Sequence, residues 1–432
     1  MSTIQDGVQE AQLTDFSLPG GGRLDEDPYV LQLQRHLQDP SLLRGDVRQT
    51  RKRQQDLLRP YLAFFLRHDN ETGFYRRLYR EAGILNRHKN AVRDRASLED
   101  LYALRLRSEE LRGDGQRERL TAFARQDLDA AKPRGRSFVS SGTSDHAAGP
   151  IRVYRSPLTL ALAYRLNGAL VDWALGTRLI EGSALLYMAE RMQDHNWFAH
   201  LGQEILGNRD IAMRYGAHLR LRPSAAAVWH RLRPDVGAIR DFVHDTRYPK
   251  YLIGTSPSLH DLLVDNTLPQ RALLNMMAGA PPIHLGRRGT VILGGGTKDP
   301  FNGDRSPQEL VREIAQYVTS DTGKGRVPAP VIDILGLTES ASSFVGRTTS
   351  PLSPQAWEHF PHPLTYVGYL EGAGNPRPVA VDRHDRGERE RQLFFVNFAC
   401  LDYLEAVVPG DVVAPVYRER LPQHGFIFRH RS

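Results

Sequence analysis

The sequence predicts an α/β protein whose sheets are mainly parallel and whose last third is a smaller β subdomain. From Ser137 onward, short apolar runs typical of strands alternate with amphipathic stretches typical of helices, which is the pattern of parallel sheets. In the last third the apolar runs have no helical pattern between them, which indicates antiparallel strands. We expect strands at residues 137–141, 183–189, 251–256, 290–296, 331–337, 392–398 and 406–417, and helices at 158–175 and 307–318.

The region before Ser137 has a helical pattern from about Tyr29 to Asp127. Apolar residues recur every three to four positions in LLRPYLAFFLRH (57–68) and in LEDLYALRLRSEELR (98–112), with arginines on the opposite face. The first residues include the turn-rich stretch LPGGGRLDEDP, which is typical of a flexible arm. We therefore expect a flexible N-terminal arm at residues 1–27 and a helical region packed on the core at 28–130. The core is expected at 131–432 and includes a β-rich subdomain at about 345–432.

Length and composition limit the class of protein. The chain has 432 residues, more than the roughly 250–300 that one hydrophobic core usually holds, so one large lobed domain or two domains are expected. No apolar run approaches the roughly 18 residues that cross a bilayer, and no signal-peptide core is present, so a membrane span is not expected. Cys400 is the single cysteine, which excludes an internal disulfide and favours the reducing cytoplasm.

The basic residues are almost all arginine, and the formal net charge is +7. Acidic residues are interspersed almost throughout, so a dedicated nucleic-acid surface is not expected. The alternative is a nucleic-acid-binding protein that uses the arginine-rich helices of residues 44–126, and its affinity would fall steeply with salt.

The first candidate site follows the strand predicted at 137–141. Successive backbone N–H groups and hydroxyls in such a loop bind phosphate, although a tight turn with local hydrogen bonds has the same composition. The loop lacks the Walker spacing G-x-x-x-x-G-K-[ST]. Its residues are Ser140, Ser141, Gly142, Thr143 and Ser144.

The second candidate site is the glycine-rich end of the strand predicted at 290–296. Gly294, Gly295 and Gly296 permit close approach of a flat or bulky ligand to the backbone. Lys298 would place an ammonium group beside that ligand. The alternative is a glycine-rich connection followed by a solvated lysine.

The remaining two candidate sites carry carboxylates. Gly336, Thr338 and Glu339 end the strand predicted at 331–337, where open α/β sheets bind ligands, and a hydroxyl beside a carboxylate supplies the oxygen ligands that Mg²⁺ prefers. The alternative for Glu339 is a carboxylate at a helix N-terminus. Asp411 lies in a turn within VVPGDVVAP (407–415), where a carboxylate can accept hydrogen bonds from a ribose, although Gly-Asp turns are common.

In this order, SSGTS, GGGTK, GLTE and PGD resemble the motifs of the adenylate-forming superfamily of acyl-activating enzymes. The chain is most similar to the acyl-protein synthetase branch, which includes the fatty-acid-activating subunit of the bacterial luminescence fatty-acid reductase. That branch has a comparable SSGTTG loop, a GGGWK segment, a G-x-TE motif and an acidic turn in a late β-hairpin. The resemblance covers roughly residues 130–431 and includes YLIGTSPSLHDLL (251–263).

The resemblance implies an adenylate-forming large lobe, ATP and Mg²⁺ as cofactors, and a carboxylic acid as substrate. It implies that residues 140–144 surround the ATP phosphates and that Gly294 to Gly296 border the adenine and acyl pocket. Thr338 would touch the α-phosphate, Glu339 would hold Mg²⁺, and Asp411 would bind the ribose. Lys298 would contribute charge to catalysis, and Arg429, or Arg431, would lie near the nucleotide.

The sequence departs from the family pattern at several positions. Thr297 replaces the tryptophan of GGGWK, and Leu335 stands where the superfamily often has tyrosine, so adenine stacking is expected to be weaker or to use another ring. Asp145 and His146 replace the usual lysine, for which Arg152 or Arg155 is a candidate substitute. The chain also stops where the superfamily continues into a small mobile lobe, so that lobe is expected to be absent.

The reaction implied is attack of a carboxylate on the α-phosphate of ATP, which gives an acyl-adenylate and pyrophosphate. We expect transfer of the acyl group to an external acceptor, namely a carrier-protein or partner thiol, coenzyme A, or an amine, and an oligomer is compatible with the sequence. Cys400 lies in the apolar stretch VNFACLDY, which favours a buried, inert thiol over a nucleophile. A catalytically degenerate member acting as a scaffold or partner subunit is the alternative.

Overall fold

The computed structural model divides the chain into two units. Unit 1 comprises Met1–Leu170, Leu337–Phe344 and Phe360–Ser432, and unit 2 comprises Val171–Gly336 and Val345–His359. The residues that the structure describes are 23–39, 41–86, 91–94, 96–140, 150–176, 179, 181–221, 230–264, 283–294, 307–322, 325–347, 357–372 and 376–431.

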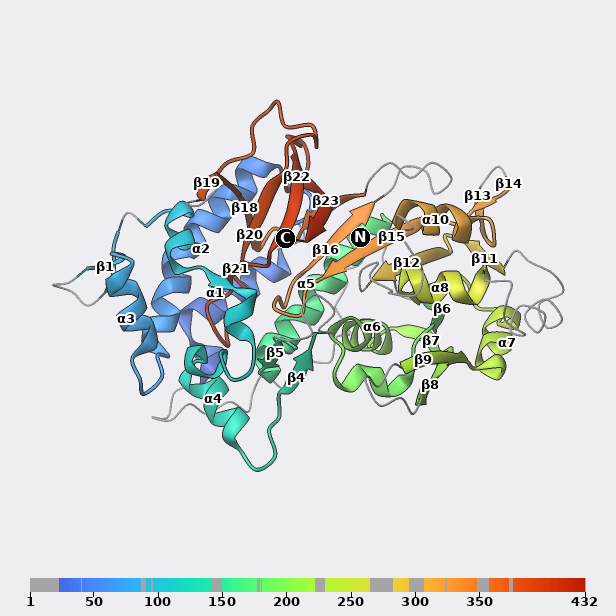
Figure 1. Cartoon of the computed structure of the whole chain (residues 1–432), viewed down its shortest axis with the longest axis horizontal. Coiled ribbons are helices and arrows are strands. Elements are labelled where there is room, and N and C mark those ends of the chain that lie inside the picture. Colours follow the sequence, from blue (N-terminus) through green and yellow to red (C-terminus); the bar gives the residue numbers. More distant parts are fainter. Residues whose placement is uncertain are drawn as a thin grey trace. The chain divides into compact units, whose positions relative to one another are not determined.

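Unit 1 begins with a group of helices (Figure 1). They are α1 (Pro28–Gln38), α2 (Val47–Arg67), α3 (Phe74–Glu81) and α4 (Ala122–Asp129). Aspartates cap the first two, because Asp27 accepts the N–H of Tyr29 and Asp46 accepts the N–H of Gln49, each at 2.8 Å. The helical pattern expected before Ser137 is therefore confirmed in the first part of the region, where α1, α2 and α3 lie, and at its end, where α4 lies.

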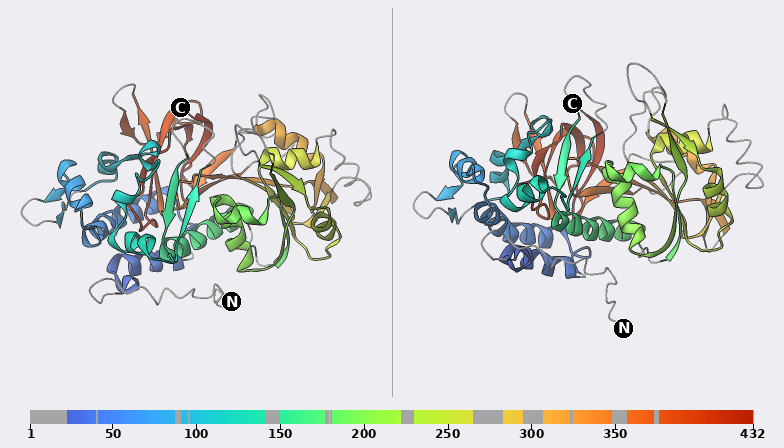
Figure 2. Two further views of the ribbon diagram at one scale, coloured as in Figure 1. Left: turned by 60° about the horizontal axis from the view of Figure 1, so that its bottom comes forward. Right: turned by 90° about the horizontal axis from the view of Figure 1, so that it is seen from below.

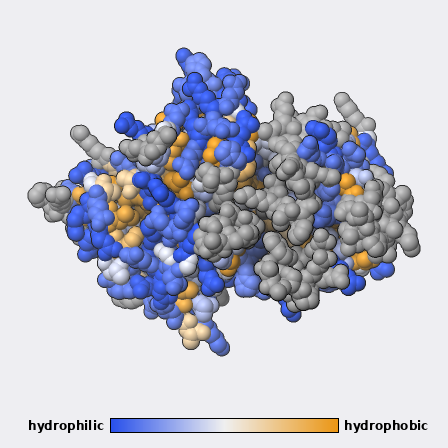
Figure 3. Space-filling model, viewed as in Figure 1, coloured by the Kyte–Doolittle hydropathy of each residue, from blue (hydrophilic) through white to orange (hydrophobic). Residues whose placement is uncertain are grey.

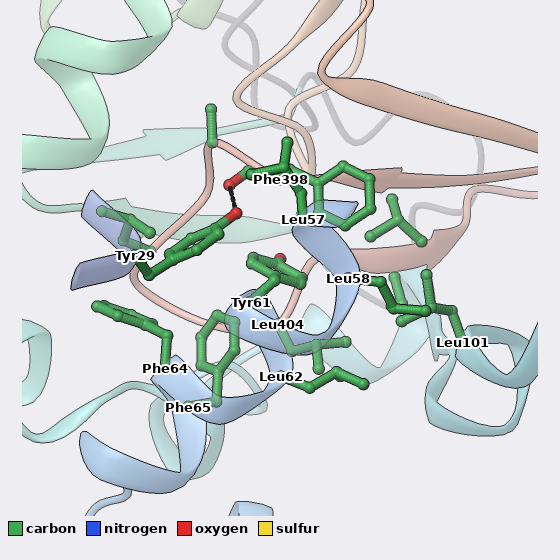
Figure 4. Packing of buried hydrophobic residues seen from close by; sticks show 14 of the residues in the cluster. Tyr29, Leu57, Leu58, Tyr61, Leu62, Phe64, Phe65, Leu101, Phe398 and Leu404 are labelled. Carbon is green, nitrogen blue, oxygen red and sulfur yellow. Dashed lines mark hydrogen bonds between the residues drawn. The ribbon is translucent and has the colours of Figure 1, made fainter. Parts of the chain in front are cut away.

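Aromatic rings join these helices to the loop that follows β20 (Arg391–Asn397) (Figure 4). The ring centroid of Tyr61 lies 5.5 Å from that of Tyr29, 5.0 Å from that of Phe65 and 5.2 Å from that of Phe398. All four side chains are fully or almost fully buried, so the core of unit 1 lies between the helices and this loop.

The prediction of a helix at 98–112 is wrong. The segment forms two 3₁₀ helices, Glu99–Leu104 and Ser108–Leu111, with β3 (Leu106–Arg107) between them. β3 pairs in parallel with β21 (Ala406–Val408), which requires an extended backbone where the apolar spacing predicted a helix. Tertiary strand pairing has overridden a local pattern.

The antiparallel sheet expected in the last third is confirmed. Its strand order is β19–β18–β20–β22–β23, and β21 pairs antiparallel with β20. Helix α2 lies against β18, since Arg51 donates to the carbonyl of Val367 and Gln54 to that of Thr365. The bounds are β18 (Thr365–Glu371), β19 (Arg377–Val379), β20 (Arg391–Asn397), β22 (Asp411–Val416) and β23 (Gly425–Arg431).

The first strand of the predicted α/β alternation has an antiparallel partner. Residues 137–141 contain most of β4 (Arg136–Val139), which forms a two-stranded hairpin with β5 (Arg152–Arg155), visible in Figure 2. Helix α5 (Pro157–Leu175) follows directly and confirms the helix predicted at 158–175. It begins in unit 1 and ends in unit 2, and β16 (Ser343–Arg347) and β17 (Glu358–Pro361) also have residues in both.

Unit 2 contains the parallel sheet that the sequence predicts. Five strands pair in parallel in the order β15–β12–β10–β6–β7. All five residues of β10 and all five of β12 are buried, as is typical of parallel strands covered on both faces. The bounds are β6 (Glu181–Leu186), β7 (Asp210–Tyr215), β10 (Lys250–Gly254), β12 (Thr290–Gly294) and β15 (Val331–Gly336).

Helices cover both faces of this parallel sheet. Leu185 and Leu293 share a core with α7 (Val236–His244), α8 (Ser256–Leu263) and α10 (Pro307–Ala315). The next residue in each of those strands faces the other way, and α6 (Trp197–Gly207) lies there, with Phe198 against Gly294 and Gly202 against Leu186. The α/β class is thus confirmed.

Smaller elements complete the two units. Unit 1 contains the pair β1 (Leu85–Asn86) and β2 (Ala91–Val92) and 3₁₀ helices at Leu24–Glu26 and Arg117–Arg119. Unit 2 contains a 3₁₀ helix at Glu190–Asp194, the hairpin β8 (Ala217–Leu221) and β9 (His230–Pro234), and a three-stranded sheet of β11 (Ile283–Arg287), β13 (Val318–Thr322) and β14 (Gly325–Pro328).

The surface of the described residues is largely polar. On the face in Figure 3 the apolar residues form only small groups among hydrophilic ones. Among the described residues, Leu31 and Tyr248 are the large hydrophobic side chains that are exposed. No described helix has both the length and the apolar character that a bilayer crossing requires.

Candidate functional site

The Thr338–Glu339 motif lies in unit 1, in a turn between β15 and β16. The Glu339 side chain is 2% exposed, and its Oε1 accepts a hydrogen bond from the Ser108 hydroxyl at 2.8 Å. No helix begins at Glu339, because the next element is a strand, so the helix-dipole alternative for this carboxylate is wrong. A buried carboxylate that is not at a helix end requires specific partners.

Buried side chains hold the main chain of this motif from several directions. The Tyr403 hydroxyl donates to the carbonyl of Glu339 at 2.6 Å, and Nη2 of Arg155 lies 3.5 Å from the carbonyl of Thr338. Both carboxylate oxygens of Glu405 accept from the N–H of Ala341, at 3.2 and 3.3 Å. The position of the Glu339 carboxylate is therefore tied to residues far away in the sequence.

An ion pair with almost no solvent exposure lies beneath the motif. Nη1 of Arg155 is 3.0 Å from Oε2 of Glu405, and their side chains are 1% and 0% exposed. The same Nη1 is 3.2 Å from Sγ of Cys400, and the guanidinium lies 5.2 Å from the centre of the Tyr403 ring. Burial raises the pKa of the Glu405 carboxyl, and the Arg155 charge opposes that shift.

The loop that supplies Cys400, Tyr403 and Glu405 is buried along its whole length. Tyrosines from the N-terminal helices bind its main chain: Tyr29 donates to the carbonyl of Phe398 at 2.6 Å, Tyr61 donates to that of Asn397 at 3.1 Å, and the Tyr75 hydroxyl accepts the N–H of Leu404 at 3.0 Å. Figure 4 shows the first of these bonds. The helical region thus binds the main chain of the loop that supplies Cys400, Tyr403 and Glu405.

The turn that contains Asp411 directly follows β21. In the parallel pair β3–β21, Arg107 lies opposite Val408, so Ser108 comes next to the start of the turn Pro409–Gly410–Asp411. Gly410 has φ 82°, a conformation that favours glycine. Because Ser108 binds Glu339, the register brings the GLTE and PGD motifs to the same end of these strands. The Asp411 side chain is 2% exposed.

Arg429 lies at a β-bulge between β22 and β23. The register shifts there, because Val412 pairs with His430 whereas Val413 pairs with Phe428. The Arg429 guanidinium donates to the carbonyl of Gly387, and Asp411 pairs with Arg431. In this conformation the carbonyl of Gly387 therefore occupies a donor of Arg429.

Only the first residue of the SSGTS loop is described. Ser140 closes the β4–β5 hairpin: its N–H donates to the carbonyl of Ile151, and its hydroxyl accepts the N–H of Ile151, both at 2.9 Å. Of the two candidate substitutes for the missing lysine, Arg152 is exposed and Arg155 is the buried partner of Glu405. The residues singled out in the sequence that lie outside the described part of the chain are Ser141, Gly142, Thr143, Ser144, Asp145, His146, Gly295, Gly296, Thr297 and Lys298.

Gly294 and Gly336 lie in unit 2, at the carboxyl ends of neighbouring parallel strands. Gly294 pairs with Ile334, two residues before Gly336. A Cβ on Gly294 would lie 2.1 Å from the ring of Phe198, so the flat group that approaches this backbone is a side chain of the protein. The sequence predicts that a ligand approaches this glycine, whereas in the structure the Phe198 ring of α6 lies there.

Sequence patterns did not single out Ser108, Tyr403 or Glu405. Glu405 did carry a signal, since it is one of two carboxylates, with Asp402, in the apolar stretch LDYLEAVV, and acidic side chains are almost never fully buried without a partner. Ser108 and Tyr403 carried none, because their partners are 231 and 64 positions away.

The donor chemistry of the motif fits Mg²⁺. The described side chains at this point carry oxygen donors, namely the carboxylate of Glu339 and the hydroxyls of Thr338 and Ser108. Within the described residues no group of three or more His, Cys, Asp or Glu side chains is placed to hold a metal ion. Mg²⁺ sites for nucleotides need only one or two carboxylates, because phosphate and water supply the other ligands.

Comparison with known proteins does not place the chain in a family. No family model matches the sequence, and no curated protein matches it. Among solved structures, the chain is similar to O-succinylbenzoate coenzyme A synthetase from Bacillus subtilis in complex with ATP and magnesium ion, with 12% identity and a TM-score of 0.36. The match covers 68% of this chain and 49% of that one, so this chain spans about half the length of the synthetase.

Proposed function

We propose that this protein activates a carboxylic acid with ATP, forms an acyl-adenylate and pyrophosphate, and passes the acyl group to an external acceptor. The observation that carries the proposal is the place of Glu339. Its carboxylate is buried, accepts from Ser108, and lies at the end of β21 where the turn to Asp411 begins. The β3–β21 register and the bond from Ser108 to Glu339 therefore support a common site for two motifs more than sixty positions apart in the sequence.

Each motif has a role in this proposal. Glu339, with Thr338, would hold Mg²⁺, which neutralises phosphate charge when bound, and Asp411 would bind the ribose. The loop at 140–144 would bind phosphates through its N–H groups, Gly294 to Gly296 and Gly336 would border the nucleotide and acyl pocket, and Lys298 and Arg429 would add positive charge. The carboxylate of the substrate is already ionised, so no general base is required, and alignment with charge neutralisation is the main task.

The burial of Cys400 supports an external acceptor. Its side chain is 0% exposed, and burial raises the pKa of its thiol well above the usual value, with the nearby Arg155 charge acting in the opposite direction. A thiol in this state is a poor nucleophile at neutral pH. A carrier-protein or partner thiol, coenzyme A or an amine is therefore the acceptor that we propose.

The test is pyrophosphate exchange into ATP that depends on a carboxylic acid. A panel of fatty, aryl and amino acids is supplied with Mg²⁺, and we expect exchange with at least one class. Glu339→Gln keeps the size of the side chain but removes the charge, and should lower exchange by about tenfold or more, as expected for loss of one charged contact.

Glu419→Gln is the matched control, because Glu419 is an exposed glutamate whose contact with Arg48 is 3.7 Å long. This variant should retain full exchange. Absence of exchange with every acid, or equal exchange in wild type and Glu339→Gln, would overturn the proposal. ATP binding without exchange would instead support a catalytically degenerate protein.

A further inference from the structure

We propose that Tyr403, Glu405 and Arg155 are positioning residues that set the place of Thr338 and Glu339, and thereby the affinity of the site for Mg²⁺–ATP. The inference deepens the proposed function. Its consequence for Mg²⁺–ATP affinity rests on that proposed function. The positioning itself is a property of unit 1 and can be measured without any nucleotide.

The motif needs such support because it has little regular structure of its own. In the Leu337–Phe344 segment, the N–H of Ser340 donates to the carbonyl of Leu337 at 3.0 Å and closes one turn. Side chains supply further bonds to this main chain, among them those of Tyr403 to Glu339, Arg155 to Thr338 and Glu405 to Ala341, and the Asn167 amide binds Ala341 and Ser343. Between β15 and β16, residues 337–342 form neither helix nor strand, so their geometry depends on such partners.

The three positioning residues also support one another. Arg155 is paired with Glu405 at 3.0 Å and lies over the ring of Tyr403. Tyr61 adds a bond to the N–H of Glu405 at 3.2 Å, so an N-terminal helix fixes the pair from the other side. Buried pairs often add little net stability compared with apolar residues of the same size. Their value here lies in fixing where the Glu339 carboxylate is held.

The chain offers a closely matched pair of variants. Tyr403 and Tyr29 are both fully buried, and each donates one hydrogen bond of 2.6 Å to a main-chain carbonyl. The carbonyl is that of Glu339 in the first case and that of Phe398 in the second. Tyr403→Phe and Tyr29→Phe therefore remove the same kind of bond, with similar expected loss of stability, but only the first removes a bond to the motif.

The first measurement is hydrogen exchange of the peptide that covers Leu337–Phe344 in the full chain without ligand. We expect exchange to be about tenfold faster in Tyr403→Phe and to change less than about twofold in Tyr29→Phe, since one hydrogen bond corresponds to about that factor. Equal changes in the two variants, or no change in Tyr403→Phe, would overturn the positioning role.

The second measurement is ATP affinity by calorimetry over a range of Mg²⁺ concentrations. The half-saturating Mg²⁺ concentration should rise by about fivefold or more in Tyr403→Phe and stay within about twofold of wild type in Tyr29→Phe. An unchanged Mg²⁺ dependence in Tyr403→Phe would contradict the link to the metal. If the wild-type protein binds no ATP, the proposed function fails, whereas the hydrogen exchange result still decides whether these residues position the motif.

A second variant keeps the test decisive if Tyr403→Phe does not fold. Glu405→Gln retains an oxygen for the N–H of Ala341 but removes the charge that faces Arg155. We expect it to raise exchange of the same peptide by about threefold or more, while Glu419→Gln, at an exposed position, leaves it unchanged. Equal exchange in Glu405→Gln and Glu419→Gln would overturn the proposal.

Discussion

The guanidinium of Arg155 and the carboxylate of Glu405 face each other at 3.0 Å, 250 positions apart in the sequence, with at most 1% of either side chain exposed. The pair lies between the loop after β20 and the turn that carries Glu339, and it touches both. Because neither charge reaches water, each depends on the other for its stability.

Removal of one partner should therefore destabilise unit 1 strongly. Arg155→Met leaves a buried carboxylate without its counter-charge, and loss of about 3–5 kcal/mol in the free energy of unfolding is expected, measured by urea denaturation. Arg155→Met combined with Glu405→Gln should cost clearly less than the sum of the single changes, because no unpaired charge remains.

The exposed pair Arg59–Asp94 is the control for this prediction. Its atoms are 2.8 Å apart, but its side chains are 58% and 73% exposed. Asp94→Asn should therefore change the free energy of unfolding by less than about 1 kcal/mol. A cost for Arg155→Met as small as that for Asp94→Asn would show that water reaches the buried pair.

Asp402 predicts a pH dependence of stability. The side chain is 0% exposed, its Oδ2 accepts the N–H of Ser156 at 3.0 Å, and burial raises the pKa of the carboxyl from 3.8 to about 6. The folded protein binds this proton more tightly than the unfolded chain does. The stabilising contribution is therefore fully present below pH 3.8 and is lost as the pH rises through 6.

Asp402→Asn isolates this effect because the amide does not titrate. The free energy of unfolding of wild type minus that of the variant should fall by about 2 kcal/mol between pH 4 and pH 7, at about 1.36 kcal/mol for each pKa unit. Urea denaturation at a series of pH values measures the difference. A difference that rises with pH would mean that Arg155 keeps Asp402 ionised in the folded state.

Much of the fold follows from local patterns in the sequence. The strands of the parallel sheet are short apolar runs because β10 and β12 are covered on both faces, so their signal does not depend on distant residues. The pattern at 98–112 misled because two residues, Leu106 and Arg107, pair with a strand 301 positions later in the chain. Spacing of apolar residues contains no information about such a partner.

The candidate site was harder to predict than the fold. The motif residues Thr338, Glu339 and Asp411 stand out in the sequence because small and acidic residues end apolar runs. Their supporting residues do not, since a tyrosine or serine inside an apolar region is also ordinary core material. The bonds from Ser108 and Tyr403 to Glu339 arise only when the chain is folded.

The burial of Cys400 predicts a thiol that is slow to react. Dithiobisnitrobenzoate should modify the native protein at least about 100-fold more slowly than the urea-unfolded chain, because reaction requires a local opening that exposes the thiolate. The assay is unambiguous, since the chain has one cysteine. Cys400→Ser should retain both pyrophosphate exchange and acyl transfer. Loss of transfer alone would identify Cys400 as an acyl acceptor after all.

The contact between Gly294 and Phe198 tests what approaches the glycine-rich strand end. A methyl group at Gly294 would lie 2.1 Å from the Phe198 ring, so Gly294→Ala should lower the stability of unit 2 by about 1–3 kcal/mol through overpacking. Adding Phe198→Ala should remove most of the clash, and the cost of Gly294→Ala should then be smaller than in wild type.

Gly207→Ala is the control for this prediction, because Gly207 is the last residue of α6, the helix that carries Phe198. An added Cβ on Gly207 would have no neighbouring atom within 4 Å. It should be neutral or stabilise the protein by up to about 1 kcal/mol, as alanine does in a helix. Thermal unfolding of the single and double variants measures how much stability each substitution costs. If Gly294→Ala costs nothing while Phe198 is present, the ring does not cover Gly294, and the backbone there is open to a flat ligand as the glycine pattern predicts.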